Sequence, residues 1–108
     1  MATLARVTDV KLGVGEKGNT NNEKIKLYME FADSFIYSKL KNVNGLILPI
    51  TNPEETLRDL ATLLSIAYFF KIESGDETLA EMAERNVDTW FDSNYNRPQF
   101  KAKSGGSI

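Results

Sequence analysis

Three glycines in residues 13–18 could bind a nucleotide, because the sequence GVGEKG matches the pattern G-x-G-x-x-G. In a dinucleotide-binding fold these glycines follow a buried strand and open a helix whose N-terminus meets the pyrophosphate. Here Thr8 and Asp9 interrupt any apolar strand before Gly13, the polar turn NTNNEK follows, and Glu16 would bring negative charge to the phosphate. The phosphate loop G-K-[ST] is also missing. We therefore interpret the segment as a glycine-rich surface loop.

Catalysis would have to rely on few side-chain types, because the chain contains neither histidine nor cysteine. The usual general base near neutral pH, the usual metal ligands and thiolate chemistry are thereby missing. Carboxylates occur in groups, at Glu54/Glu55, Glu73/Asp76/Glu77, Glu81/Glu84 and Asp88/Asp92. Most of them fall at helix starts or on polar helix faces, whereas a catalytic carboxylate needs burial or a like-charged neighbour. The segment ESGDETLAE also lacks the residue order of a calcium loop. The residues predict a protein that is not an enzyme and holds no cofactor or metal.

The remaining residues could serve DNA binding or the binding of a small ligand. A DNA-binding helix-turn-helix needs a basic recognition helix, whereas the second long helix is apolar and the third is acidic. The three basic residues after Asn94 could contact phosphate only weakly. Aromatic side chains could line a ligand pocket, but no convergent polar groups accompany them, and helical spacing is more typical of core or interface. These aromatic residues are Phe31, Phe35, Tyr68, Phe69, Phe70, Trp90 and Phe91.

The first long element, residues 22–43, has the period of an amphipathic helix. Its main stripe consists of Ile25, Met29, Ala32, Ile36, Leu40 and Val43. Leu27, Tyr28, Phe31 and Phe35 widen this stripe well beyond what a single core contact requires. An Asn44-Gly45 turn and the apolar segment LILPI follow.

The second long helix, residues 54–74, is the most apolar element. Asn52 is expected at the N-cap, Pro53 at the first helical position and Glu55 at the third, as in a capping box. The main stripe is Leu57, Leu60, Ala61, Leu64, Ala67, Tyr68 and Ile72, beside a second stripe of Leu63, Ile66 and Phe70. Only Arg58, Thr62, Ser65 and Phe69 occupy the remaining arc. Such a helix must be covered on two sides, and full cover within this chain is hard to find. We therefore expect surplus apolar surface and oligomerisation.

The remaining elements complete an all-α fold: a bundle of three main helices plus a short N-terminal helix. The third main helix, residues 77–94, is expected to point Leu79, Met82, Ala83 and Trp90 inward, with Val87 on the flank. The short helix, about residues 8–13, is expected to pack through Val7, Val10 and Leu12. Neither a signal peptide nor a membrane-spanning run is found, so we expect a soluble protein made in a cytoplasm.

An extended C-terminal arm is expected at residues 94–108, after a helical domain at residues 1–93. It contains Pro98, two glycines and three basic side chains without an acidic one, whereas the rest of the chain has 10 basic and 15 acidic residues. A basic arm that bears aromatic residues favours capture by a partner, for example as an added strand.

The order and local character of these elements resemble the head-tail connector (adaptor) proteins of tailed bacteriophages. The matching segments are RVTDVKLGVG, then the helix NNEKIKLYMEFADSFIYSKL, then ILPITNPEETLRDLATLLSIAYFF, and finally AEMAERNVDTWFD. Together they cover essentially residues 4–93. The longer and more polar glycine loop and NTNN turn depart from the family pattern.

The resemblance implies a structural protein of the virion neck. Copies of the chain, typically twelve, would form a ring below the portal protein, with DNA as passing cargo and the next neck or tail protein bound beneath. The portal-docking arm would use Tyr95, Arg97, Phe100, Lys101 and Lys103. The ring interface would use Leu27, Phe31, Leu63, Ile66 and Phe70. No catalysis, cofactor or membrane contact is implied.

Two other hypotheses remain open on the sequence. A small helical regulatory or interaction module would bind one protein partner through the face of Ile66 and Phe70 and would have a dispensable tail. A small carboxylate enzyme would have a concave site containing at least one carboxyl group of raised pKa.

Overall fold

A computed structural model describes residues 3–16, 18 and 21–95 of the chain. These residues form four helices and no strand: α1 (Val7–Val14), α2 (Asn22–Leu40), α3 (Glu55–Ser74) and α4 (Thr78–Asn94). The predicted all-α fold, with three main helices and a short N-terminal one, is confirmed. The expected arm after Tyr95 lies outside the described residues.

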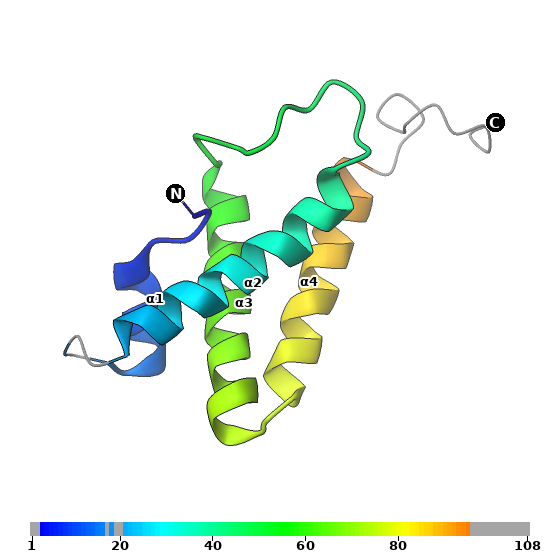
Figure 1. Ribbon diagram of the computed structural model, residues 1–108. Helices are drawn as coiled ribbons and strands as arrows, with labels where there is room; N and C mark the ends of the chain where they lie inside the picture. Colours follow the sequence, from blue (N-terminus) through cyan, green and yellow to red (C-terminus); the bar gives the residue numbers. More distant parts are fainter. Residues whose placement is uncertain (1–2, 17, 19–20, 96–108) are drawn as a thin grey trace.

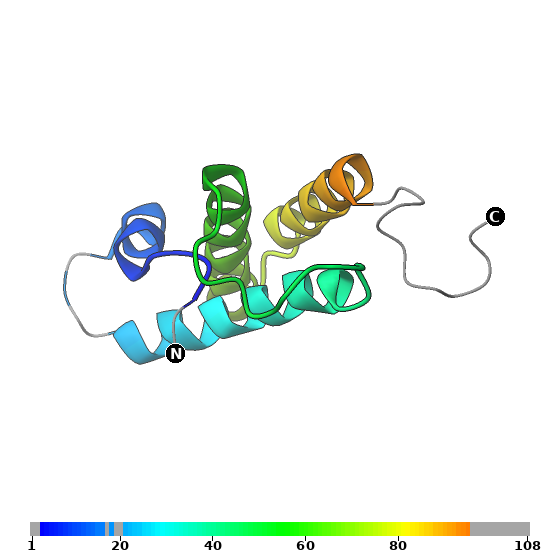
Figure 2. The same cartoon turned by 90° about the horizontal axis from the view of Figure 1, so that it is seen from above.

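The helices form two layers. Figures 1 and 2 show α1, α3 and α4 side by side, with α2 crossing them as the second layer. Helix α3 lies in the middle and contacts each of the other three helices. The loop of residues 41–54 returns over the upper end of the bundle, from the end of α2 to the start of α3 (Figure 1).

Helix α3 receives more cover from its own chain than its apolar pattern led us to expect. Ser65, predicted on the arc outside both stripes, is fully buried, and its hydroxyl donates a 2.7 Å hydrogen bond to the Ala61 carbonyl. Ile72, predicted in the main stripe, is instead 53% exposed. Ser65 is buried because α1, α2 and α4 all contact α3, whereas Ile72 lies in the last turn of α3 on a side that is open to solvent. The chain thus buries one side of this helix, while Leu63 and Phe70 stay partly exposed and Ile72 is exposed, so apolar surface is left over on α3.

The start of α3 also differs from the expected capping box. Glu54 has extended backbone angles, and the helix begins at Glu55, so Asn52 and Pro53 lie outside it. The preceding loop packs on the core through Leu46, Leu48 and Ile50. This packing fixes the position of the chain before α3 begins. The Ile50 N–H donates a 3.2 Å hydrogen bond to the Tyr37 hydroxyl, which ties the loop to α2.

The predicted main stripe of α2 is confirmed, because all six of its members are buried. The helix ends at Leu40, three residues earlier than expected, although Val43 still packs in the core. Gly45 takes a left-handed conformation with φ +82° in the turn that follows. Glycine adopts such angles without steric cost, which explains the Asn44-Gly45 signal.

Helix α4 is rotated relative to the predicted face. Val87 is fully buried and not on the flank, and Met82 is 46% exposed. The buried positions include Ala80 and Ala83, whose small side chains face the bundle. Because the distance between packed helices depends on the side chains at the contact, these alanines favour close approach to α3 and turn Met82 outward.

Helix α1 packs by a different route from the predicted one. Val10 is fully buried, but Leu12 is 79% exposed, and Leu4 from the preceding segment enters the core in its place. Gly13, the first glycine of the G-x-G-x-x-G match, lies inside α1, where an added Cβ would stand 2.1 Å from Cδ1 of Ile66. This glycine therefore permits close approach between α1 and α3, so the predicted surface loop is shorter than residues 13–18.

Candidate functional site

A hollow on the described surface lies where α4 ends. It has a volume of about 550 Å³ and is formed by the loop before α3, the first turn of α3 and the last turn of α4. We call it the loop hollow. Its lining consists of Leu46, Ile47, Pro49, Ile50, Thr51, Asn52, Pro53, Glu54, Leu57, Trp90 and Tyr95.

Aromatic rings form one wall of the loop hollow. Tyr95 contacts Trp90 and Phe91, with ring centroids 5.4 Å and 6.0 Å apart. Burial raises the pKa of the Tyr95 phenol, and the nearby Glu54 carboxylate raises it further. Among the described residues of the lining, Glu54 is the single charged one. The loop hollow is thus largely apolar with one negative charge.

Of the five predicted portal-docking residues, one belongs to the described part of the chain and four lie outside it. Tyr95 is half-buried against the end of α4, so its ring belongs to the helical body. Arg97, Phe100, Lys101 and Lys103 lie outside the described residues. Their role in docking stays a prediction.

The predicted ring-interface residues differ in exposure. Leu27 and Phe31 on α2 are exposed, while Leu63, Ile66 and Phe70 on α3 are half-buried. Leu63 and Ile66 pack against the core, which leaves less of them for another subunit.

Phe31 also lines a smaller hollow of about 260 Å³. The predicted ring-interface residues of α3, Leu63, Ile66 and Phe70, are not part of its lining. The residues that share this hollow with Phe31 are Tyr68, Lys71, Ile72 and Glu84. The exposed apolar surface at Phe31 is therefore extended by Ile72, which sequence reasoning had assigned to the core.

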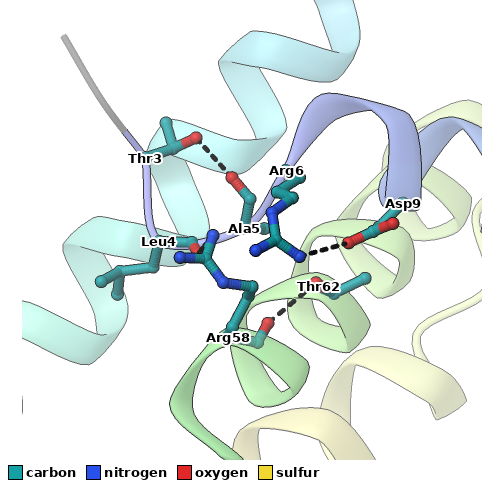
Figure 3. Close-up of polar contacts among 7 residues, drawn as sticks. All are labelled: Thr3, Leu4, Ala5, Arg6, Asp9, Arg58 and Thr62. Atoms are coloured by element: carbon teal, nitrogen blue, oxygen red, sulfur yellow. Dashed lines mark hydrogen bonds and ion pairs between the residues drawn. The ribbon is translucent and has the colours of Figure 1, made fainter. Parts of the chain in front are cut away.

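Asp33 is a partly buried carboxyl group on α2. Its Oδ1 accepts a 3.3 Å hydrogen bond from the Leu4 N–H, and the Leu4 carbonyl accepts a 3.0 Å bond from the Arg58 guanidinium. Figure 3 shows Arg58 reaching from α3 to this segment, with Arg6 and Asp9 paired beside it. The N-terminal segment is thereby bound to α2 and α3 at once. No local pattern could reveal contacts between residues 29 and 54 positions apart.

Burial raises the pKa of Asp33 to about 6; the Leu4 N–H opposes this rise, and the negative charge of Glu30 adds to it. A raised carboxyl pKa is what the enzyme hypothesis required, but it required a concave site as well. Asp33 lines neither the loop hollow nor the hollow at Phe31. Its hydrogen bond goes to a backbone amide of its own chain, which assigns it a structural role.

We expect Asp33→Asn to flatten the pH dependence of stability between pH 4 and 6. The folded chain holds the Asp33 proton more tightly than the unfolded chain, so the stability from this group is full at low pH and is lost as pH rises through about 6. Asparagine keeps an oxygen for the Leu4 N–H and does not titrate. Above pH 6 the variant should be more stable by about 1 kcal/mol, a value reduced for screening of a partly exposed group.

Urea denaturation of both proteins at pH 4, 5, 6 and 7 would measure this difference. The exposed Asp59→Asn is the matched control, because it removes one negative charge from the surface of α3. Parallel stability curves for Asp33→Asn and wild type would contradict the prediction.

Two tyrosines are held as neutral hydrogen-bond donors and not as bases. The Tyr28 hydroxyl donates to Glu73, and the Tyr68 hydroxyl donates a 2.8 Å bond to Glu84. Burial, together with the carboxylate partner, raises the pKa of Tyr28 to about 12 and also raises that of Tyr68. These bonds join α3 to α2 and α4.

Neither a metal centre nor a membrane span is found in the part of the chain that the structure describes. There, no three acidic side chains converge as they would around an ion, and no helix combines the length and apolarity needed to cross a bilayer. No protein-family model, curated protein or solved structure matches the chain.

Proposed function

We propose that this chain is a head-tail connector of a tailed-phage virion, which forms a ring beneath the portal and carries no catalytic activity. The observation that carries the proposal is the contrast between a helical body rich in acidic residues and a C-terminal segment that is basic and contains Phe100. This contrast suits a protein whose body packs with copies of itself while its end binds a neighbour.

Ring packing would use exposed apolar side chains on α2. Leu27 and Phe31 lie one helical turn apart and leave a continuous apolar strip facing solvent. Because rings are built from heterologous contacts, this strip would meet a different surface on the next copy. Leu63 and Phe70 are only partly buried and remain candidates for that surface.

The body's charge suits a channel through which DNA passes. Ten basic and 15 acidic side chains precede the arm, so the body carries net negative charge. Phosphate binding depends on neutralisation by lysine and arginine, and a negative wall would let DNA slide without sticking. DNA would therefore be cargo and not a ligand.

Reversing charge in the arm should weaken docking on the portal. Lys101→Glu combined with Lys103→Glu is expected to weaken binding to the portal ring of the same virion at least about tenfold, since a charged hydrogen bond contributes about 1.5–3 kcal/mol. The control is Lys26→Glu with Lys41→Glu, which makes the same charge change at exposed positions on the body. Native mass spectrometry of the mixed proteins would count bound copies.

The connector proposal expects the wild type and the control to load a full ring on each portal, while the arm variant does not. Equal loading by both variants would exclude the arm as the docking element. A soluble complex with one copy of a single non-portal partner would reject the connector proposal itself.

A second candidate function is an interaction module that binds one protein partner. The exposed Phe31 and Ile72 beside a 260 Å³ hollow favour it, because an exposed apolar patch of this kind can anchor a partner side chain. The face of Ile66 and Phe70 suits this role less well, since Ile66 closely approaches Gly13 of α1. Complex stoichiometry separates the two functions.

A further inference from the structure

We propose that the loop hollow is the docking site for this chain's own C-terminal segment, residues 96–108, with the Phe100 ring seated in it. The arm would then be held by its own body until a partner displaces it. This inference goes beyond the proposed connector function and does not depend on it, because it concerns the isolated chain.

The loop hollow leaves apolar surface exposed to solvent, and a bound group would bury this surface. Ile47 is 84% exposed at its edge, while Leu57 and Trp90 connect it to the core. Its volume of about 550 Å³ accommodates an aromatic ring and part of the adjoining chain. Well-formed apolar hollows of roughly 300–1,000 Å³ are typical binding sites.

Connectivity favours the chain's own segment over other occupants. Tyr95 lines the loop hollow and is also the last described residue, so residues 96–108 leave from its wall. Phe100 follows only five positions later, and five residues span at most about 17 Å. Such a short tether gives effective concentrations on the order of millimolar, so even a weak contact can form within the chain.

Charge complementarity favours the same occupant. Glu54 is the single charged side chain among the described residues of the lining, and it lies near Tyr95, after which residues 96–108 follow. Residues 96–108 contain Arg97, Lys101 and Lys103 and no acidic side chain. Phe100 is followed directly by Lys101 and lies three residues after Arg97. Binding of its ring in the loop hollow would therefore bring these positive charges close to Glu54.

Internal docking would control when the arm binds elsewhere. A partner can use only the fraction of chains in which the segment is released, so its apparent affinity is lowered by that fraction. A partner that supplies more contacts than Glu54 and the loop hollow would overcome this cost. In a free copy of the chain, Phe100 and Ile47 would cover each other, so neither side chain would be available to another copy.

Nuclear magnetic resonance of the full chain, labelled at isoleucine methyl groups and the tryptophan indole, tests the proposal. We expect cross-peaks between the Ile47 Cδ1 methyl and the Phe100 ring, and an upfield shift of that methyl from the ring current. Phe100→Ala should abolish both signals, whereas the neighbouring Gln99→Ala, the matched control, should retain them. Trp90 is the only tryptophan, so its indole signal should shift in Phe100→Ala but not in the control.

A second variant tests the body side of the contact. Ile47→Asp changes an 84% exposed side chain, so the fold should be retained while the Phe100 ring is expelled. Its Trp90 indole signal should then match that of Phe100→Ala.

Two results would overturn the proposal. The first is identical Ile47 and Trp90 spectra in wild type and Phe100→Ala. The second is loss of the upfield shift of the Ile47 methyl on tenfold dilution, which would make a second copy the occupant. Portal binding is measured separately, so failure of the connector proposal would leave these spectra unchanged.

Discussion

Replacing Leu64 with alanine is expected to lower the free energy of unfolding by about 2–5 kcal/mol. Leu64 lies in the middle of α3 with 0% of its surface exposed, at the point where three other helices surround this one. Removing its branched end loses apolar burial and leaves a cavity that α2 and α4 cannot both move to fill. Since small domains are stable by roughly 5–15 kcal/mol, the loss is a large fraction of the total.

The matched control is Ile72→Ala on the same helix, two turns further on. The apolar pattern places both residues in one stripe, but Ile72 is 53% exposed. Its replacement should change stability by no more than about 0.5 kcal/mol, as is usual for surface positions. Urea denaturation followed by circular dichroism would measure both. Equal losses from the two variants would show that the end of α3 is buried, against the structure.

Replacing Leu4 with alanine is expected to cost a similar amount, about 2–5 kcal/mol, although the residue precedes the first helix. Leu4 is only 1% exposed, and its backbone is held on both sides, by Asp33 at the N–H and by Arg58 at the carbonyl. The side chain therefore packs at a fixed position and cannot shift to compensate. Losing it should also loosen α1, which continues from this segment.

Leu12→Ala is the control for this second variant, because it removes the same atoms from a position that is 79% exposed. We expect a change within about 0.5 kcal/mol. Amide hydrogen exchange would add a local readout: Leu4→Ala should speed exchange in α1 more than in α4, whereas Leu12→Ala should not. A stable Leu4→Ala protein with unchanged exchange would show that the N-terminal segment is dispensable for the core.

The helices themselves could be predicted from the sequence. Residues 22–43 were expected to be helical with a stripe that begins at Ile25, and the structure buries that whole stripe. The second long helix was expected to end at residue 74, and it does so, with Gly75 as a left-handed C-cap at φ +73°. These features depend on neighbours three or four residues apart and on the freedom of glycine, so local sequence suffices.

Which apolar residues are buried could be predicted only in part. Helix α3 is apolar on most of its circumference, so its pattern does not say which side faces α2, α1 or α4. Ser65 and Ile72 were therefore misplaced, and Met82 was misplaced because the buried face of α4 consists of Ala80, Ala83, Val87 and Trp90. Periodicity gives the width of an apolar face, whereas burial depends on how helices cross.

The candidate sites depend most on tertiary structure. By itself, the sequence determined an all-α chain without histidine or cysteine, with an acidic body and a basic end. Only the fold brought residues 46–57 beside Trp90 and Tyr95 to form the loop hollow. It also placed Leu4 between Asp33 and Arg58 and buried much of Asp33, and this burial raises the pKa of Asp33 although the Leu4 N–H opposes the rise. Local periodicity encodes helices, but hollows and shifted pKa values arise from contacts between distant segments, whose geometry is decided when the helices pack.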